Sequence, residues 1–150
     1  MAVILLVEDD PDLRPTLEAI LKSDGHTVRA VADGSFGVAS FEQGRPDLVI
    51  TDIVMPNREG IETIRMMRAL DARVPIIAIS GGGEMRHELS YLTLAQKLGA
   101  SATLAKPFRP AELRALVKEV LAGAESDAKP SGSAMGGPGS AEKRRLDRAG

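Results

Sequence analysis

The sequence predicts a doubly wound α/β domain built around a parallel β-sheet. Along the first 122 residues, short apolar runs alternate with longer stretches whose apolar residues have helical spacing. Three of the short runs are apolar throughout, as expected for strands that helices cover on both faces. Strands that alternate with helices are typical of parallel sheets, because each parallel connection needs a crossover.

Five segments have the composition and length of β-strands. Val3–Val7, Leu48–Thr51 and Val74–Ile79 are the clearest, and each is bounded by turn-forming or charged residues. Thr27–Ala32 and Ala102–Ala105 are weaker runs. Since helical stretches alternate with these segments, we expect five strands and five helices.

The first helical stretch has a start signal and a stop signal. Its apolar residues fall at i, i+4, i+7 and i+8, at Leu13, Leu17, Ile20 and Leu21. Asp10 is placed to cap the amino end, Pro11 fits a first turn, and Gly25 is expected to stop the helix.

Four further helices are predicted on the same grounds. Gly34–Gln43 is the weakest, and it is expected to turn Val38 and Phe41 inward. Pro110 opens the last helix. The remaining apolar stripes are Ile61, Ile64 and Met67, then Leu89, Leu92 and Leu98, and finally Leu113, Leu116, Val117, Val120 and Leu121.

The composition changes near Gly123. Gly, Ala, Ser and Pro make up 17 of the 28 residues from 123 to 150, and Met135 and Leu146 are the only large apolar residues there. Such a segment buries too little apolar surface to offset the entropy lost on ordering. We therefore expect one folded domain over residues 1–122 and a disordered Gly/Ala/Ser/Pro-rich tail over residues 123–150.

The composition also argues against several classes of function. The formal net charge is −2, without the basic excess typical of nucleic-acid-binding proteins. There is no Cys for disulfides or thiolate sites, and two His residues are too few for most histidine-based sites. The amino-terminal residues do not form a signal peptide, and no run approaches the roughly 18 apolar residues of a membrane span. We expect a cytoplasmic protein without direct contact to membranes or nucleic acid.

Polar residues follow the predicted strands at the edge where a doubly wound sheet places its sites. In strand order they are Glu8, Asp9 and Asp10, then Asp52, Ser80 and Lys106. Three carboxylates about 5 Å apart would repel by roughly 3 kcal/mol per pair at an effective dielectric of about 20. A hard divalent cation would offset that repulsion, and Mg²⁺ prefers carboxylate, carbonyl and water oxygens.

Lys106 and Ser80 would complete an anion site beside such an ion. An ammonium and a hydroxyl can bind phosphoryl oxygens while a carboxylate is positioned to attack phosphorus. Together these residues predict phosphoryl transfer to an aspartate.

Four motifs at these strand ends resemble the receiver domains of two-component response regulators. They are Leu6-Val7-Glu8-Asp9-Asp10, Thr51-Asp52-Ile53-Val54-Met55-Pro56 with Gly60 following, Ile77-Ala78-Ile79-Ser80, and Ala105-Lys106-Pro107-Phe108. The resemblance covers Val3 to about Leu121. It implies a flavodoxin-like doubly wound fold, with a five-stranded parallel sheet in the order 2-1-3-4-5 and five helices.

The resemblance implies a role for each matching residue. Asp52 corresponds to the phosphoacceptor, and Lys106 to the lysine that pairs with the acidic pocket and then with the phosphoryl group. Asp9, Asp52 and the backbone carbonyl of Val54 are implied as Mg²⁺ ligands, with Glu8 holding the ion through water.

The output side departs from the family pattern. Ser80 corresponds to the switch hydroxyl, but Thr103 stands where the family usually has the aromatic switch residue. The spacing from Ser80 to the lysine is also longer than usual, beginning at Gly81–Gly83. Because Thr103 is too small to replace a ring, we expect phosphorylation to reorder the loop after Ser80 and the helix that begins near Glu84. The resemblance also implies a cis Lys106–Pro107 peptide bond.

A receiver domain is a signalling switch and not an enzyme with an external substrate. The resemblance implies transfer from a sensor histidine kinase or a histidine phosphotransferase, followed by binding of a downstream protein through an altered face. The domain would catalyse only its own phosphorylation and autodephosphorylation, with Mg²⁺ as cofactor.

Three other classes are alternatives. A receiver-like interaction module that is not regulated by phosphorylation would not need the complete acidic pocket. A haloacid-dehalogenase-like Mg²⁺ phosphohydrolase needs Asp-x-Asp at its nucleophile, whereas Val54 stands two residues after Asp52. A flavodoxin-like cofactor-binding protein needs a phosphate loop after the first strand, where Glu8-Asp9-Asp10 would repel a phosphate.

Overall fold

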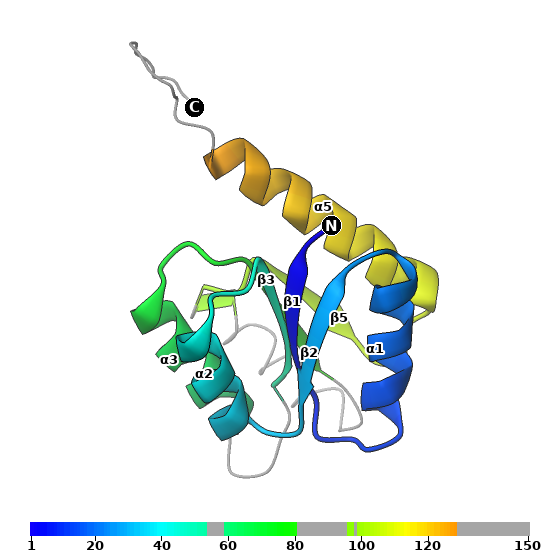
Figure 1. Cartoon of the computed structure of the whole chain (residues 1–150), viewed down its shortest axis with the longest axis horizontal. Coiled ribbons are helices and arrows are strands. Elements are labelled where there is room, and N and C mark those ends of the chain that lie inside the picture. The colour runs from blue at the N-terminus through cyan, green and yellow to red at the C-terminus, as the bar shows by residue number, and fades with distance from the viewer. Residues whose placement is uncertain (54–58, 81–95, 98, 129–150) are drawn as a thin grey trace. The chain divides into compact units, whose positions relative to one another are not determined.

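The computed structural model describes residues 1–53, 59–80, 96–97 and 99–128. Its centre is a five-stranded parallel sheet with the strand order β2-β1-β3-β4-β5 (Figure 1). The strands are β1 Val3–Val7, β2 Thr27–Val31, β3 Leu48–Asp52, β4 Ile76–Ser80 and β5 Ala102–Ala105. The described helices are α1 Leu13–Ser23, α2 Gly34–Gln43, α3 Glu59–Leu70 and α5 Pro110–Ala128. The doubly wound fold and the strand order are those that the sequence and its resemblance predict.

The register brings the carboxyl ends of the strands to one edge of the sheet. Val7, the last residue of β1, pairs with Thr51, the next-to-last residue of β3. Ser80, the last residue of β4, pairs with Ala105, the last residue of β5. Residues that end or directly follow these strands therefore share one edge of the sheet, as a parallel topology requires.

The apolar core lies on both faces of the sheet. Helices α2 and α3 cover one face, and α1 and the start of α5 cover the other (Figure 1). All five residues of β3 are buried, and Phe41 and Met67 pack against the α2–α3 face without any exposed surface. Burial on both faces explains why the central strands are apolar at successive positions.

Helix α1 begins later than the sequence predicts. The Asp10 carboxylate binds the amino end of this helix, as expected. Its Oδ1 accepts hydrogen bonds from the N–H groups of Asp12 and Leu13, at 2.8 and 3.1 Å. Pro11, however, lies in a turn before the helix, and the N-cap residue is Asp12. The helix ends at Ser23, and Gly25 follows the C-cap residue Asp24 as the predicted stop, with a φ of +92° that suits a residue without a side chain.

Strand β4 also begins later than predicted, at Ile76. The N–H of Val74 donates to Asp71 Oδ1 at 3.3 Å, and the Val74 carbonyl accepts from Arg68 Nη1 at 2.7 Å. One polar group of Val74 thus binds α3 and the other binds the connection after α3, so neither is used for the sheet. Pro75 supplies no N–H for the sheet ladder.

Helix α5 continues through Ala128, into the segment predicted to be disordered. The helix therefore runs past the composition change at Gly123, and the disordered tail stays a prediction. Ala and Glu are strong helix formers, and the single Gly123 costs only about 1 kcal/mol relative to Ala. Residues 129–150 lie outside the described residues, as do Gly81–Gly83 and the start of the helix expected near Glu84.

Candidate functional site

Three acidic side chains meet at the carboxyl ends of β1 and β3. Glu8 and Asp9 directly follow β1, and Asp52 is the last residue of β3. One carboxylate oxygen from each lies within 4.8 Å of the others. Glu8 is 1% exposed and Asp52 is 3% exposed, whereas Asp9 lies at the surface. The predicted acidic cluster is therefore present, with its exposed member on the solvent side.

Lys106 brings a positive charge to this cluster from the end of β5. Its Nζ donates a hydrogen bond to Asp52 Oδ2 at 2.9 Å and lies 3.3 Å from Glu8 Oε1. The Lys106–Pro107 peptide bond is cis, as the family resemblance implies. The pairing of Lys106 with the acidic pocket is also as expected.

The electrostatics of the pocket favour an additional cation. Burial, followed by the charge of Asp52, raises the pKa of Glu8 to about 7. Burial alone would lower the pKa of Lys106, but the hydrogen bond and charge of Asp52, together with Glu8, outweigh it and raise that pKa. Lys106 is thus held in its charged form, while one ammonium does not fully compensate the neighbouring carboxylates.

The donor set fits Mg²⁺. Glu8 Oε1 is buried, and within the described part of the chain its one printed contact is the ion pair with Lys106 Nζ at 3.3 Å, without a hydrogen bond. A buried carboxylate oxygen that lacks a hydrogen bond is costly, and binding of a hard cation relieves that cost. The exposed Asp9 leaves one side open to water, which Mg²⁺ usually retains in its coordination shell.

The turn after β1 is hydrogen-bonded to itself and to α1. The Asp10 N–H donates to Glu8 Oε2 at 3.1 Å, and Arg14 Nη1 donates to the Glu8 carbonyl oxygen at 2.9 Å. Hydrogen bonds from the N–H groups of Asp12 and Leu13 lower the pKa of Asp10. Asp10 therefore serves the helix and does not join the acidic cluster. The role of Arg14 was not expected from the sequence.

Gly60 lets α3 pack directly against the end of β3. A Cβ atom at this position would overlap the backbone carbonyl oxygen of Asp52 and the Cα of Ile53. The backbone of the predicted phosphoacceptor is therefore held against the first turn of α3. The sequence motif includes Gly60, but only the structure shows what its missing side chain permits.

For three predicted site residues, the structure does not test the predicted role. Val54 lies outside the described residues, as does the side chain of Ser80, although the Ser80 backbone ends β4. Thr103 is half-buried on β5 and pairs with Ala78. Their predicted roles in metal binding and switching stay predictions.

A parallel sheet that gathers buried acids and a lysine at its carboxyl edge defines a receiver-type signalling domain. Comparison with known families agrees with this class. The chain belongs to the response regulator receiver domain family, whose sequence profile matches residues 4–118. It is therefore a receiver domain of two-component response regulators, and its pocket of Glu8, Asp9 and Asp52 fits a phosphoacceptor site.

The chain is similar to part of two curated regulators. It is 35% identical over 118 residues to the DNA-binding response regulator MtrA of Mycolicibacterium smegmatis, covering 79% of this chain and 50% of MtrA. It is equally identical over 118 residues to the transcriptional regulatory protein PrrA of Mycobacterium bovis, covering 79% of this chain and 49% of PrrA. The chain thus spans about half the length of these relatives.

Solved structures show the same fold over most of the chain. A CheY-like receiver domain protein from Methanospirillum hungatei is 26% identical with a TM-score of 0.78, covering 85% of this chain and 99% of that protein. The chemotaxis protein CheY4 from Vibrio cholerae is 27% identical with a TM-score of 0.71, covering 80% of this chain and 98% of CheY4. In the part of the chain that the structure describes, no helix is long and apolar enough to cross a membrane.

Proposed function

We propose that this chain accepts a phosphoryl group on the carboxylate of Asp52 and uses it to switch a protein-binding face. The observation that carries the proposal is the contact of Lys106 Nζ with Asp52 Oδ2 at 2.9 Å inside the acidic cluster. This contact places the cation that would bind phosphoryl oxygens beside the carboxylate that would attack phosphorus.

Asp9 and Asp52 would hold Mg²⁺ directly and Glu8 would hold it through water. The backbone carbonyl of Val54, which the resemblance supplies, would be a further ligand. Bound Mg²⁺ would neutralise carboxylate charge and the charge that develops on the phosphoryl oxygens. The buried Glu8 Oε1, which makes no hydrogen bond within the described residues, supports this assignment.

In the proposed step, a carboxylate oxygen of Asp52 attacks the phosphorus of a phosphohistidine. The new O–P bond forms as the P–N bond breaks, and the imidazole nitrogen leaves with the bonding electrons and takes up a proton. Lys106 stabilises the charge on the phosphoryl oxygens, and its positive charge persists because the pocket raises its pKa. The acyl phosphate is later hydrolysed by water, so the domain acts only on its own phosphorylation state.

A histidine kinase or a histidine phosphotransferase is the proposed donor. Beside Lys106 lies an apolar groove of about 360 Å³, lined mainly by residues of α1 and of the segment after β5. Leu13, Leu17 and Phe108 are among its lining residues. A helix that carries a phosphohistidine could pack on this groove and present its imidazole to Asp52, since the groove and the pocket share Lys106.

Ser80 and Thr103 are proposed to transmit the signal. The Ser80 hydroxyl would bind a phosphoryl oxygen and draw the following loop inward, and Thr103 would not supply an aromatic switch. The downstream partner is a protein, and a cytoplasmic location without direct nucleic-acid contact stays a prediction. The relatives named as DNA-binding or transcriptional regulators are about twice the length that they share with this chain.

Intact mass after incubation with acetyl phosphate and Mg²⁺ tests the phosphoacceptor directly. We expect the mass of one phosphoryl group to be added to the wild type and to Asp12→Asn, which changes an exposed aspartate near the site. Asp52→Asn should gain none. Full labelling of Asp52→Asn would contradict the proposal.

A further inference from the structure

The backbone of Glu8 is held from two directions. Its N–H donates to the Val31 carbonyl of β2 at 3.1 Å, which continues the sheet by one residue. Its carbonyl oxygen accepts a hydrogen bond from Arg14 Nη1, on α1, at 2.9 Å. Glu8 is the first residue beyond β1, so the guanidinium binds a carbonyl at the point where the strand ends.

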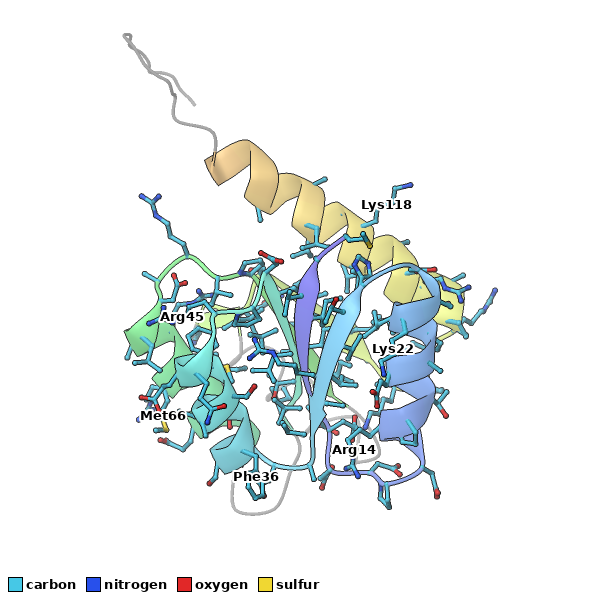
Figure 2. The ribbon with its side chains drawn as sticks, in the orientation of Figure 1. Arg14, Lys22, Phe36, Arg45, Met66 and Lys118 are labelled. Atoms are coloured by element: carbon cyan, nitrogen blue, oxygen red, sulfur yellow. The ribbon has the colours of Figure 1, made fainter. Side chains whose placement is uncertain are left out.

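Arg14 also holds the other end of the same turn. Its backbone N–H donates to the Asp10 carbonyl oxygen at 3.0 Å. The two hydrogen bonds of Arg14, one from the side chain and one from the backbone, therefore bracket Asp9. The guanidinium lies beside the turn that follows β1 (Figure 2).

We propose that Arg14 is a positioning residue for the metal site, clamping the Glu8–Asp10 turn so that the Glu8 and Asp9 carboxylates stay in ligating positions. The proposal rests on the proposed function, because it concerns the residues that would hold Mg²⁺. Residues that orient metal ligands through hydrogen bonds contribute to affinity without touching the ion.

The positive charge of Arg14 makes the proposal testable. A cation this close to the acidic cluster repels Mg²⁺. If Arg14 acted only through its charge, replacing it with a neutral residue would therefore make Mg²⁺ bind more tightly. A positioning role predicts weaker binding, because the two carboxylates lose their fixed geometry. The two explanations therefore predict opposite signs for the same substitution.

Isothermal titration with Mg²⁺ decides between these signs. Arg14→Met keeps the length of the side chain but removes the donor and the charge, and we expect its Kd to rise about tenfold. Arg14→Lys keeps the charge and one donor, so its Kd should stay within about threefold of the wild type. Lys22→Met removes a charge from the last turn of the same helix and should leave the Kd unchanged.

A measurement on metal-free protein tests the clamp independently of the ion. The Asp10 N–H is bonded to Glu8 Oε2, so amide exchange at Asp10 reports the order of the turn. We expect exchange at Asp10 to become faster in Arg14→Met and to be unaffected in Lys22→Met. Thermal unfolding of each variant establishes that the domain remains folded.

Each outcome has one meaning. Weaker Mg²⁺ binding and faster Asp10 exchange in folded Arg14→Met support the clamp. Equal or tighter binding in that variant overturns the positioning role, and so does unchanged Asp10 exchange. A wild type that binds no Mg²⁺ overturns the proposed metal site, while the exchange data still decide whether Arg14 orders the turn.

Discussion

Lys106→Met should destabilise the metal-free protein, because it removes the cation from a pocket of buried carboxylates. Lys106 Nζ lies 2.9 Å from Asp52 and 3.3 Å from Glu8, which are 3% and 1% exposed. Removing one partner of a buried ion pair typically costs about 3–5 kcal/mol. The Lys106 side chain itself is 22% exposed, so solvent screens part of the interaction, and we expect a loss of about 2–3 kcal/mol.

A double-mutant cycle separates the ion pair from other effects of the substitution. Lys106 forms ion pairs with Asp52 and Glu8, and Asp52→Asn removes the first of these two. Lys106→Met should therefore cost less in an Asp52→Asn background than in the wild type, with a coupling energy of about 1–2 kcal/mol.

Urea unfolding in the presence of a chelator measures these differences, and the same series with Mg²⁺ adds a second readout. We expect the deficit of Lys106→Met to shrink in Mg²⁺, because the ion replaces part of the missing positive charge. Lys22→Met is the control, since Lys22 is exposed and pairs with Glu18 at the surface. Its free energy of unfolding should change by less than about 0.5 kcal/mol. Equal metal-free stability of Lys106→Met and the wild type would refute the electrostatic interpretation of the pocket.

Three further predictions follow from the site. Mg²⁺ should stabilise the wild type by about 2.7 kcal/mol at a hundredfold excess over Kd, and Asp9→Asn should lose most of this increment in a thermal melt; an equal increment argues against the ligand assignment. Gly60→Ala should cost about 1–3 kcal/mol in urea unfolding and slow labelling by acetyl phosphate, because the new methyl overlaps the β3 backbone, whereas Gly123→Ala meets nothing within 4 Å and should be neutral or slightly stabilising. A beryllofluoride mimic should change amide exchange over residues 81–92 in the wild type but not in Ser80→Ala; identical exchange with and without the mimic would exclude the loop switch.

The sequence predicts the fold well where burial alone decides the structure. In β1, Val3 is half-buried and Ile4–Val7 are buried, so the continuous apolar run indicates a strand covered on both faces, and its predicted bounds are correct. The predicted start of β4 at Val74 is wrong. Val74 forms backbone hydrogen bonds with Asp71 and Arg68, and the apolar character of its side chain does not reveal such bonds. The composition change near Gly123 does not mark the end of α5, because helix-forming Ala and Glu continue the helix through Ala128.

In the candidate site, too, some residues can be predicted from the sequence and others only from the structure. Glu8, Asp9, Asp52 and Lys106 are the residues proposed to carry the chemistry, and the strand pattern places all four at one edge of the sheet. The part played by Arg14 could not be predicted, since its partner is a backbone carbonyl that has no sequence signature. Gly60 shows the same limit, because its effect depends on how closely α3 approaches β3.

Identification of the modified residue tests the central claim most directly. Borohydride reduces an aspartyl phosphate to homoserine, which peptide mass spectrometry locates in the chain. After treatment with acetyl phosphate and Mg²⁺, we expect homoserine at residue 52, and we expect none when a chelator replaces the metal. Homoserine at Asp9 or Asp12 instead, or unmodified Asp52 in protein that binds Mg²⁺, would contradict the assignment of Asp52 as the phosphoacceptor.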